Sequence, residues 1–594
     1  MNTIAALPGN HLARRLTAGL AALACSSTLA GAQTTVREVW GTANGYEYGA
    51  SIAPTADLNA DGIVDFLVGS PGWLSGHGGV SLVSGRYLRY GTQPISLASY
   101  DLSHGLPSSM FEAGDCVASI GDIAGDTRPE LVIGAPGGGP GWIACINPVS
   151  TVPIASVFGE AFGDRFGDAL AATGDVNLDG YEDVLVGAPL HDGFGTDAGA
   201  AYLISGKLLA TQTGVATLNK FAGLADGGQT GLAVESGVDL NGDTRAELVI
   251  ASPRNHGFPS DADAGVVRVF NGSSYGQLWI GVGVTGERFG STLCYVPDLN
   301  GDGVKDLAIG APYSDAAGTN AGRVIVYSGA ALAQAATVQI VEWTGSNANS
   351  LFGSSIAAVG DVNHDGVGDI AIGAHGYVPL FVGNDNGAVY VYSGATLERM
   401  VQMTGPAEAK IGRAVSSALD CNADSVSDFL VSGFNHAGDN TLDGYLAAVS
   451  LFPEIPASYC TGKTNSAGCV PSITSTGSAS LGSSSAFNVG AVNELNQKNG
   501  LLFYGFDNNA AAFQGGTLCV KPPTARSAIQ NSGGSALGND YSGSFSFDFK
   551  ARIQGGLAPN LVLGQEVFCQ YWARDPGSPS TTSLSNALRF LIGP

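Results

Sequence analysis

An acidic turn that recurs seven times is the feature that most constrains how this chain folds. Four copies follow the full pattern Asp-x-Asn-x-Asp-Gly-x-x-Asp. They begin at Asp57, Asp175, Asp298 and Asp361. Three weaker copies begin at Asp122, Asp239 and Asp420. Successive first aspartates lie 65, 53, 64, 59, 63 and 59 residues apart, and a period near sixty is typical of a propeller or an array of repeats.

Short strand-like segments surround each turn. An aromatic–glycine pair precedes the clear copies: Tyr48-Gly49, Phe166-Gly167, Phe289-Gly290 and Phe352-Gly353. Apolar runs that end in Gly-Ala-Pro or Gly-Ser-Pro follow the turn, at residues 66–71, 131–136, 184–189 and 307–312. Alternating segments come next, at residues 79–85, 322–329 and 387–394, and residues 338–343 fit a fourth, outer strand. Four strands per sixty residues predict one propeller blade per repeat, in an all-β fold.

Together, these three motifs resemble the FG-GAP repeat, the unit of the N-terminal propeller of integrin alpha subunits. The resemblance covers about residues 36–452. It implies a seven-bladed β-propeller with four-stranded blades, which holds calcium in the hairpins between the first two strands of each blade. It also implies that those hairpins lie on one face and that partners dock on the opposite face.

The acidic turns are candidate calcium sites. Oxygens at positions 1, 3, 5 and 9, with the carbonyl of position 7, suit a cation that takes six to eight oxygen ligands. Without a cation, carboxylates this close would raise one another's pKa. Asp, Asn and Gly are also ordinary turn residues, but a turn does not require the acid at position 9.

Six turns supply the predicted ligands. The first two sets are Asp57, Asn59, Asp61, Ile63 and Asp65, then Asp175, Asn177, Asp179, Tyr181 and Asp183. The next two are Asp239, Asn241, Asp243, Arg245 and Glu247, then Asp298, Asn300, Asp302, Val304 and Asp306. The last two are Asp361, Asn363, Asp365, Val367 and Asp369, then Asp420, Asn422, Asp424, Val426 and Asp428. The turn at 122–130 has Ala124 at position 3, and full occupancy is not expected there.

Composition agrees with a propeller and limits the partners. The 87 glycines and 13% charged residues suit many short strands joined by tight turns. The net charge is −25, but positions 1, 5 and 9 of the seven turns hold 21 of the 51 acidic residues, at sites where a cation would neutralise them. The charge therefore does not indicate a polycationic partner, and it argues against nucleic acid.

Residues 1–32 are expected to be a signal peptide. Arg14 and Arg15 precede an apolar run at residues 16–24, and Ala30-Gly31-Ala32 offers a cleavage site. No later run reaches ~18 apolar residues, so no transmembrane segment is expected. The sequence therefore predicts a secreted protein, extracellular or at the cell surface.

A second, β-rich domain is predicted after the propeller, which is expected to span residues 33–456. Residues 457–594 alternate well enough for a small sandwich-like fold, and they contain no histidine for acid–base catalysis. Its four cysteines allow three pairings, and proximity favours Cys460 with Cys469, which leaves Cys519 with Cys569. Within the propeller, Cys116 and Cys145 are expected on strands one and three of one blade, roughly 9.6 Å apart and beyond disulfide reach.

Two classes of function fit the sequence. The favoured one is a non-enzymatic, calcium-binding recognition or adhesion module for a protein or carbohydrate. The other is a secreted hydrolase, phospholipase-like or glycosidase-like, and a purely structural role at a surface or in a matrix stays open. The Gly-x-Ser-x-Gly pattern at residues 272–276 falls at a hairpin turn, which disfavours a nucleophile there.

The predicted ligand-binding face follows from the repeat. Loops 190–198, 254–264, 313–321 and 375–386 should gather opposite the acidic turns, and loops on a rigid scaffold are where binding residues concentrate. Tyr377 and Phe381 are the candidate ligand-binding residues. Residues 36–40 are expected to close the ring by pairing with the last repeat, because no blade precedes them.

Overall fold

The structure is a computed structural model. It describes residues 34–40, 47–58, 63–72, 77–85, 111–148, 153–212, 216–255, 262–362, 366–379, 385–406, 408–419, 427–434, 444–450, 457–477, 479, 486–536, 540–554, 561 and 566–592. The predicted signal peptide lies outside these residues.

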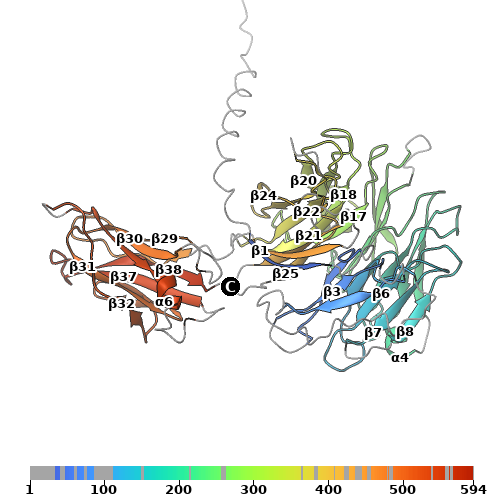
Figure 1. Cartoon of the computed structure of the whole chain (residues 1–594). Helices are drawn as coiled ribbons and strands as arrows, with labels where there is room; N and C mark the ends of the chain where they lie inside the picture. The colour runs from blue at the N-terminus through green and yellow to red at the C-terminus, as the bar shows by residue number, and fades with distance from the viewer. Residues whose placement is uncertain are drawn as a thin grey trace, which may run out of the picture.

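Antiparallel sheets follow one another along residues 34–450 (Figure 1). The first three hold β2 (Ile52–Pro54), β3 (Phe66–Gly69) and β4 (Val80–Val83); β5 (Val117–Ser119), β6 (Leu131–Ala135), β7 (Trp142–Ile146) and β8 (Pro153–Phe158); and β9 (Leu170–Gly174), β10 (Asp183–Ala188), β11 (Ala200–Ile204) and β12 (Thr217–Ala222). The next two hold β13 (Val234–Glu235), β14 (Leu248–Ser252), β15 (Val266–Phe270) and β16 (Gln277–Val282); and β17 (Thr292–Val296), β18 (Asp306–Ala311), β19 (Arg323–Tyr327) and β20 (Gln339–Thr344). The last two hold β21 (Ser355–Gly360), β22 (Asp369–Ala374), β23 (Ala388–Tyr392) and β24 (Arg399–Thr404); and β25 (Val415–Leu419), β26 (Asp428–Gly433), β27 (Tyr445–Ser450) and β1 (Thr34–Trp40).

The first strands of these sheets form a closed ring. Each contacts the first strand of the next sheet, in the order β2, β5, β9, β13, β17, β21 and β25, and β25 contacts β2 again. Within the described residues, seven sheets therefore surround a common axis. The predicted all-β propeller architecture is confirmed.

The two ends of the repeat region share one sheet, as predicted. β1 pairs antiparallel with β27, with Thr34 opposite Ser450 and Trp40 opposite Tyr445. An ion pair of 2.9 Å between Arg413 Nη2 and Glu47 Oε2 also crosses this junction. The pairing removes the exposed edge that β27 would otherwise present.

The aromatic–glycine pair and the Gly-Ala-Pro segment form one joint. The amide of each pair's glycine donates to a carbonyl near the end of the second strand of its own sheet, at 2.8–3.0 Å. The bonds run from Gly49 to Gly69, Gly114 to Gly134, Gly167 to Gly187, Gly231 to Ala251, Gly290 to Gly310, Gly353 to Gly373 and Gly412 to Ser432. The joint therefore exists in all seven repeats, including the three with Ala113, Thr230 or Ile411 in place of the aromatic residue.

The same glycines set the distance between neighbouring sheets. A Cβ built on Gly187 would lie 1.9 Å from the carbonyl oxygen of Gly231 in the next sheet, and one on Gly134 would lie 2.0 Å from that of Gly167. Gly167 and Gly231 have φ of 96° and 89°, a left-handed conformation that glycine adopts at little cost. Glycine is therefore needed on both sides of this contact.

The aromatic residue of the pair packs between sheets. Phe166 is buried and meets the ring of Tyr202 edge-on, with centroids 5.3 Å apart. Ile143 and Cys145 on β7 of the preceding sheet belong to the same apolar cluster. Cys116 and Cys145 are both free, as predicted.

Among the described residues, short helices occupy two of the corners after a third strand, where the sequence predicts only small turns. They are α4 (Gly206–Thr211) and α5 (Gly329–Ala333). Ser205 and Ser328 cap them, since each hydroxyl accepts an amide three residues on. No helix among the described residues is long and apolar enough to cross a membrane.

Residues from Ala457 onward form separate sheets (Figure 1). One contains β28 (Ala457–Tyr459), β38 (Thr582–Leu591), β37 (Glu566–Arg574), β31 (Asn499–Gly505), β34 (Ala525–Arg526) and β35 (Gln530–Asn531). The others contain β29 (Ser472–Thr476), β30 (Asn488–Glu494) and β36 (Gly543–Asp548), and the hairpin β32 (Asn508–Phe513) and β33 (Gly516–Val520). One further helix, α6 (Phe549–Gln554), follows β36.

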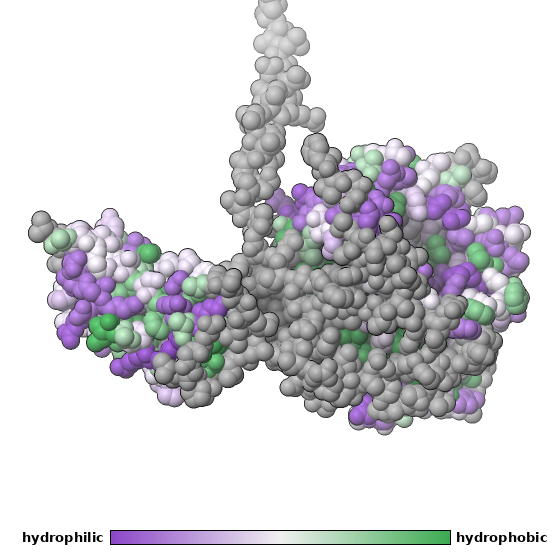
Figure 2. Space-filling view, in the orientation of Figure 1, coloured by the Kyte–Doolittle hydropathy of each residue, from purple (hydrophilic) through white to green (hydrophobic). Residues whose placement is uncertain are grey.

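The core of this region lies between two sheets. Val489 and Phe545 of the smaller sheet pack against Tyr504, Tyr571 and other apolar residues of the larger one. Figure 2 shows the described outer surface as mostly hydrophilic on the face drawn, with small hydrophobic patches. The arrangement is that of a sandwich, although the boundary at residue 457 stays a prediction.

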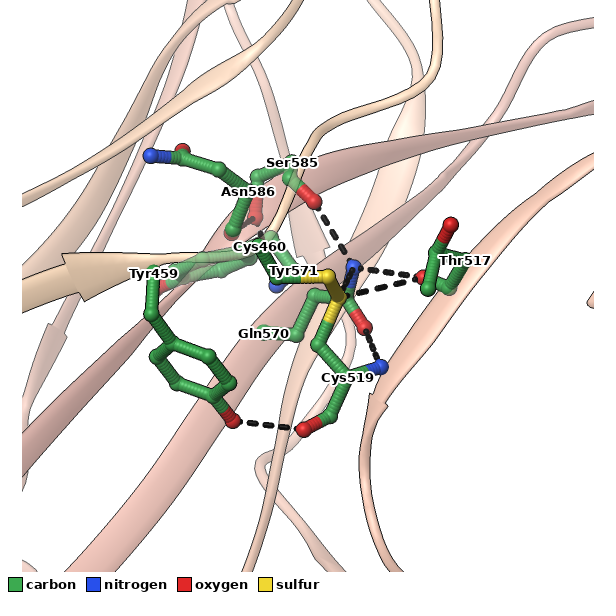
Figure 3. The surroundings of a disulfide bond; sticks show 8 residues. All are labelled: Tyr459, Cys460, Thr517, Cys519, Gln570, Tyr571, Ser585 and Asn586. Carbon is green, nitrogen blue, oxygen red and sulfur yellow. Dashed lines mark hydrogen bonds between the residues drawn. A yellow bond between two sulfur atoms is a disulfide. The ribbon is translucent and has the colours of Figure 1, made fainter. Parts of the chain in front are cut away.

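The disulfide pairing predicted from proximity is wrong. Cys460 bonds to Cys519, with Cα atoms 6.3 Å apart, while Cys469 and Cys569 are free (Figure 3). Side chains alternate along β37, so Cys569 faces the core between the sheets. The next residue, Gln570, faces the other side, where its Oε1 accepts the amide of Cys519 at 3.1 Å. Cys519 therefore meets Gln570 rather than Cys569.

A pair of serine substitutions tests this disulfide. Cys460→Ser should lower the free energy of unfolding by about 2–4 kcal/mol, because it frees a long loop in the unfolded chain. Cys469→Ser, at a free and similarly exposed thiol, should change it little. Denaturant titration gives the energies, and peptide mapping without reductant should yield a Cys460–Cys519 cross-link. A Cys460–Cys469 cross-link would contradict the structure.

The glycine joint predicts a second stability difference. Gly187→Ala should lower the free energy of unfolding by about 1–3 kcal/mol, because the new methyl group would overlap the Gly231 carbonyl. Gly276→Ala is the matched control, since its Cβ would meet only the Ser274 hydroxyl, at 3.3 Å. Equal unfolding midpoints for the two variants would contradict this account of the joint.

Candidate metal centres

The acidic turns connect the first and second strands of each sheet, and backbone amides fix their first residue. Asp298 Oδ1 accepts the amides of Gly301 and Asp302 at 2.7 and 3.1 Å, and its Oδ2 accepts that of Gly303 at 2.6 Å. Asp122 and Asp239 accept the equivalent amides of their own turns. The aspartate at position 1 thus folds the backbone around its own carboxylate.

The backbone has a left-handed conformation at two positions of the turn. At position 6, φ is 90° at Gly180, 87° at Gly303 and 92° at Gly366, as the sequence predicts for glycine. Thr127 and Thr244 adopt the same conformation without glycine, at 76° and 72°. Position 4 is left-handed too, at Gly125, Leu178, Gly242 and Gly301. Sequence reasoning missed position 4, although glycine stands there in three of these copies.

The acid at position 9 is fully buried in all seven turns. These residues are Asp65, Glu130, Asp183, Glu247, Asp306, Asp369 and Asp428. Asp369 Oδ2 accepts the amide of Val362 at position 2, and its Oδ1 accepts the amide of Gly394 after the third strand, at 2.8 and 2.9 Å. Asp65 and Asp306 make the same two bonds. This carboxylate therefore ties the turn to the neighbouring corner of its sheet.

Three turns bring their acids together. Carboxylate oxygens of positions 1, 5 and 9 lie within 4.8 Å of one another in three sets. These sets are Asp122, Asp126 and Glu130; Asp239, Asp243 and Glu247; and Asp298, Asp302 and Asp306. Residues 59–62, 363–365 and 420–426 of the other turns lie outside the described residues, so the predicted ligands among them are not placed.

The turn at 175–183 retains an oxygen that suits a cation. Asn177 Oδ1, at position 3, is buried and has no hydrogen-bond partner. Asp175 accepts the amides of Asp179 and Gly180, at 3.0 and 2.7 Å, so the turn has the usual fold. A buried amide oxygen without a donor is costly unless an ion or water satisfies it.

Burial and like charges shift the pKa of the position 9 acids. Burial, reinforced by Asp179 and Asp175, raises the pKa of Asp183 to about 7. Burial also raises the pKa of Glu247 to about 7 and that of Asp306 to about 6, and neighbouring aspartates add to both shifts. Holding these carboxylates charged is unfavourable, and a bound divalent cation would relieve that cost.

A side chain just after the third strand donates a hydrogen bond to the aspartate at position 5. Ser328 Oγ donates to Asp302 Oδ2 at 2.9 Å, and Asn271 Nδ2 donates to Asp243 Oδ2 at 3.1 Å. Asn147 Nδ2 contacts both Asp126 and Glu130, at 2.7 and 3.2 Å. Sequence reasoning did not assign this role, although a Ser-Gly pair recurs at that corner. The turn at 122–130, where full occupancy is not expected, brings its three acids together like the other two.

The donor set suits a hard cation. Every side chain in these clusters offers oxygen, and none offers sulfur or imidazole nitrogen, which favours calcium or magnesium over zinc or copper. Where position 3 is Ala124, one side-chain oxygen is missing. The clusters therefore fit a hard divalent cation.

The other candidate residues lie apart from the turns. Tyr377 is half-buried and packs edge-on against Tyr390, with centroids 6.3 Å apart, while Phe381 lies outside the described residues. At residues 272–276, the amide of Asn271 donates to the carbonyl of Gly276 at 2.8 Å. Ser273 Oγ lies within hydrogen-bond distance of Asn271 Oδ1 and Asp243 Oδ2 and can donate to either. This segment is a hairpin turn, as predicted.

Comparisons with known proteins agree with the repeat architecture. The FG-GAP repeat family matches residues 166–204, 289–327 and 352–392. Integrin alpha-5 of Xenopus laevis is 28% identical over 231 residues, which cover 36% of this chain and 21% of that protein. Integrin alpha-7 of Mus musculus is 32% identical over 214 residues, which cover 34% and 17%. The match thus spans about a fifth of each integrin subunit.

Among solved structures, the chain is similar to the Dos1 propeller. The TM-score is 0.36 at 10% sequence identity, and the match covers 65% of this chain and 74% of that one. The chain carries FG-GAP repeats, and it is similar to integrin alpha subunits over part of their length.

Backbone strain in the turns yields a prediction. Thr244→Gly should raise the free energy of unfolding by about 1 kcal/mol in the presence of a chelator, because it relieves a left-handed β-branched residue. The reverse change, Gly303→Thr, should lower the free energy of unfolding by a similar amount at the equivalent position. Denaturant titration measures the free energy of unfolding of both variants. A lower value for Thr244→Gly than for the unchanged protein would contradict backbone strain at this position.

Proposed function

We propose that this protein is a secreted calcium-binding propeller that acts as an extracellular recognition or adhesion module. The observation that carries the proposal is the assembly of three-carboxylate clusters in a repeat similar to that of integrin alpha subunits. The expected signal peptide supports export, and the all-oxygen donor sets suit the calcium of an extracellular medium. The ligand class is protein or carbohydrate.

Calcium in this proposal stabilises the fold rather than taking part in chemistry. The cluster at residues 298–306 lies in a turn whose acid at position 9, Asp306, also accepts amides from two parts of its sheet. A cation bound there would hold the turn, the second strand and the corner together. Because such an ion binds only the folded protein, it adds to stability by mass action.

The ligand face lies at the other ends of the sheets. In an antiparallel sheet, the loop between strands two and three is opposite the turn between strands one and two. Phe194 lies in such a loop, while Phe162 and Leu224 lie in the connections into β9 and β13. Their exposed fractions are 77%, 87% and 54%, and exposed apolar residues that lie together mark interaction sites.

Hydrogen bonds join the loops that carry these residues. The amide of Leu190 donates to the carbonyl of Asp164 at 3.2 Å, and that of Gly227 donates to the carbonyl of Thr196 at 2.7 Å. The three apolar residues are thus held by one connected set of loops, which favours a protein as the ligand. Tyr377 and Phe381 remain further candidates in a loop of the same kind.

Chelation tests the calcium proposal in the full chain. If each site binds at ~10⁻⁴–10⁻³ M, then ~10 mM calcium should add about 1.4–2.7 kcal/mol per occupied site. Calcium should therefore raise the melting temperature of metal-free protein, measured by calorimetry. A melting curve indifferent to calcium would show that these are only turns.

Two aspartate variants separate the sites. Asp302→Asn should remove part of the calcium response, because it weakens a turn with oxygens at positions 1, 3, 5 and 9. Asp126→Asn should remove less, because Ala124 leaves that turn one side-chain ligand short. The same calorimetry without calcium reports any loss of stability unrelated to the ion. Equal losses of response would contradict this ranking.

The recognition face has its own test. An array of extracellular proteins and glycans, probed with calcium present, identifies a ligand. Phe162→Ser and Phe194→Ser should then each weaken binding by about tenfold or more, as at apolar hot spots. Ile529→Ser, at a residue 70% exposed outside the propeller, is the matched control. Unchanged affinity in both phenylalanine variants would exclude this face.

A further inference from the structure

A groove lined by several hydroxyl-bearing residues opens on the region that follows the propeller. It measures about 630 Å³, within the ~300–1,000 Å³ usual for small-molecule sites. Its lining includes Thr461, Lys463, Thr464, Thr517, Ser578 and Ser580, together with glycines and one proline. Lys463 is the one ionisable residue among those that line it. The groove thus combines hydroxyl groups with a single positive charge.

The charge of Lys463 has no counter-ion among the described residues. Its Nζ donates to Ser578 Oγ at 2.9 Å, to the carbonyl of Thr582 at 2.6 Å, and to Ser580 Oγ. These three acceptors are neutral, and no carboxylate of the described chain forms an ion pair with this lysine. The ammonium is therefore held in place by hydrogen bonds but is not neutralised.

One hydroxyl beside the ammonium is positioned to donate a hydrogen bond to a ligand. Ser580 Oγ donates its proton to the carbonyl of Gln514 at 2.6 Å. Ser578 Oγ accepts from Lys463 and donates to no described group, so its proton is available to the groove. A hydroxyl that accepts from an ammonium is a polarised donor, because hydrogen bonds in series strengthen one another. Lys463 and Ser578 together therefore favour an anion.

The walls of the groove are rigid. Two backbone hydrogen bonds close the loop that carries the serines. The amide of Asp575 donates to the carbonyl of Thr581 at 2.9 Å, and the amide of Thr581 donates to the carbonyl of Ser578 at 2.8 Å. The amide of Lys463 donates to the carbonyl of Leu584 at 2.8 Å. Gly516 leaves room for the lysine, since a Cβ there would lie 2.9 Å from Lys463 Cβ. The site is preformed, which lowers the entropic cost of binding.

The charge of the surrounding chain is compatible with an anionic ligand. Residues 457–594 contain 8 lysines and arginines against 6 aspartates and glutamates, whereas residues 1–456 contain 18 against 45. A single lysine is too little for a nucleic acid, whose phosphates call for a basic patch. The lining offers several hydroxyls beside apolar surface, a combination that suits a polyhydroxylated ligand.

We propose that the groove around Lys463 binds the carboxylate of an acidic sugar of the uronic acid class. Lys463 supplies the charge, Ser578 donates a hydrogen bond to the carboxylate, and the threonine hydroxyls meet the hydroxyls of the sugar. This site lies outside the FG-GAP repeats and does not depend on calcium in the acidic turns.

Titration calorimetry of the full chain with a galacturonate trimer tests the site. A chelator is present, so that calcium in the propeller cannot bridge protein and ligand. The trimer should bind, and Lys463→Gln should weaken it by about tenfold or more, whereas Lys463→Arg should retain part of the affinity. Lys521→Gln, at an exposed lysine that pairs with Asp507, should leave the affinity unchanged.

Further arms decide between outcomes. Ser578→Ala keeps the charge and should weaken binding several-fold, which covers the case in which Lys463→Gln disturbs the loop. A neutral galactose trimer should bind much more weakly. Equal binding of the neutral trimer, unchanged affinity in both Lys463→Gln and Ser578→Ala, or no binding of the galacturonate trimer would overturn the proposal. Preference for a peptide with a free C-terminal carboxylate would overturn the assignment to a sugar.

Discussion

The contact between a glycine of one blade and a glycine of the next is the constraint on which the propeller depends. Gly187 lies so close to the Gly231 carbonyl that even a methyl group would overlap it. Gly231 in turn donates its amide to Ala251 within its own sheet, at 2.8 Å. The contact therefore sets the spacing between blades and anchors each blade internally. Five of the seven contacts between blades are glycine–glycine, and Ala251 and Ser432 stand at the other two. Since interiors are close-packed, contacts this close leave little freedom in how the sheets meet.

The acidic turns use this scaffold from the other end of each blade. Position 9 is buried in every copy, and the carboxylates of Asp65, Asp306 and Asp369 each accept amides from two backbone segments at once. The same carboxylate faces two aspartates in the assembled clusters. A structural role and the proposed metal-binding role thus meet in one residue, and burial gives that residue a raised pKa, as at Asp306. A cation would satisfy both roles by neutralising the cluster without releasing the amides.

The region after Ala457 is held together by a core between two sheets, a buried glutamine and a disulfide rather than by a repeated glycine contact. Its two sheets bury one apolar core, and the alternation along β37 sends Cys569 into that core and Gln570 outward. Gln570 then donates to the carbonyls of Thr517 and Ser585, at 3.1 and 2.7 Å, beside the Cys460–Cys519 bond (Figure 3). The disulfide and this buried amide together fix the hairpin β32–β33, whose tip, at Gly515 and Gly516, forms one wall of the groove at Lys463.

The sequence by itself determined what repeats along the chain. The period, the glycines of the joint and the oxygens of the turns are local patterns, and so they predicted the blades, the closure by residues 36–40 and the candidate ligands. Only the tertiary structure decided what depends on contacts between distant segments. The aromatic position also accepts Ala113, Thr230 and Ile411. The glycine that follows makes the hydrogen bond of the joint whichever side chain precedes it. Asn147, Asn271 and Ser328 reach the acidic turns from a neighbouring hairpin, and Cys460 meets Cys519 rather than nearby Cys469 because strand pairing overrides distance along the chain.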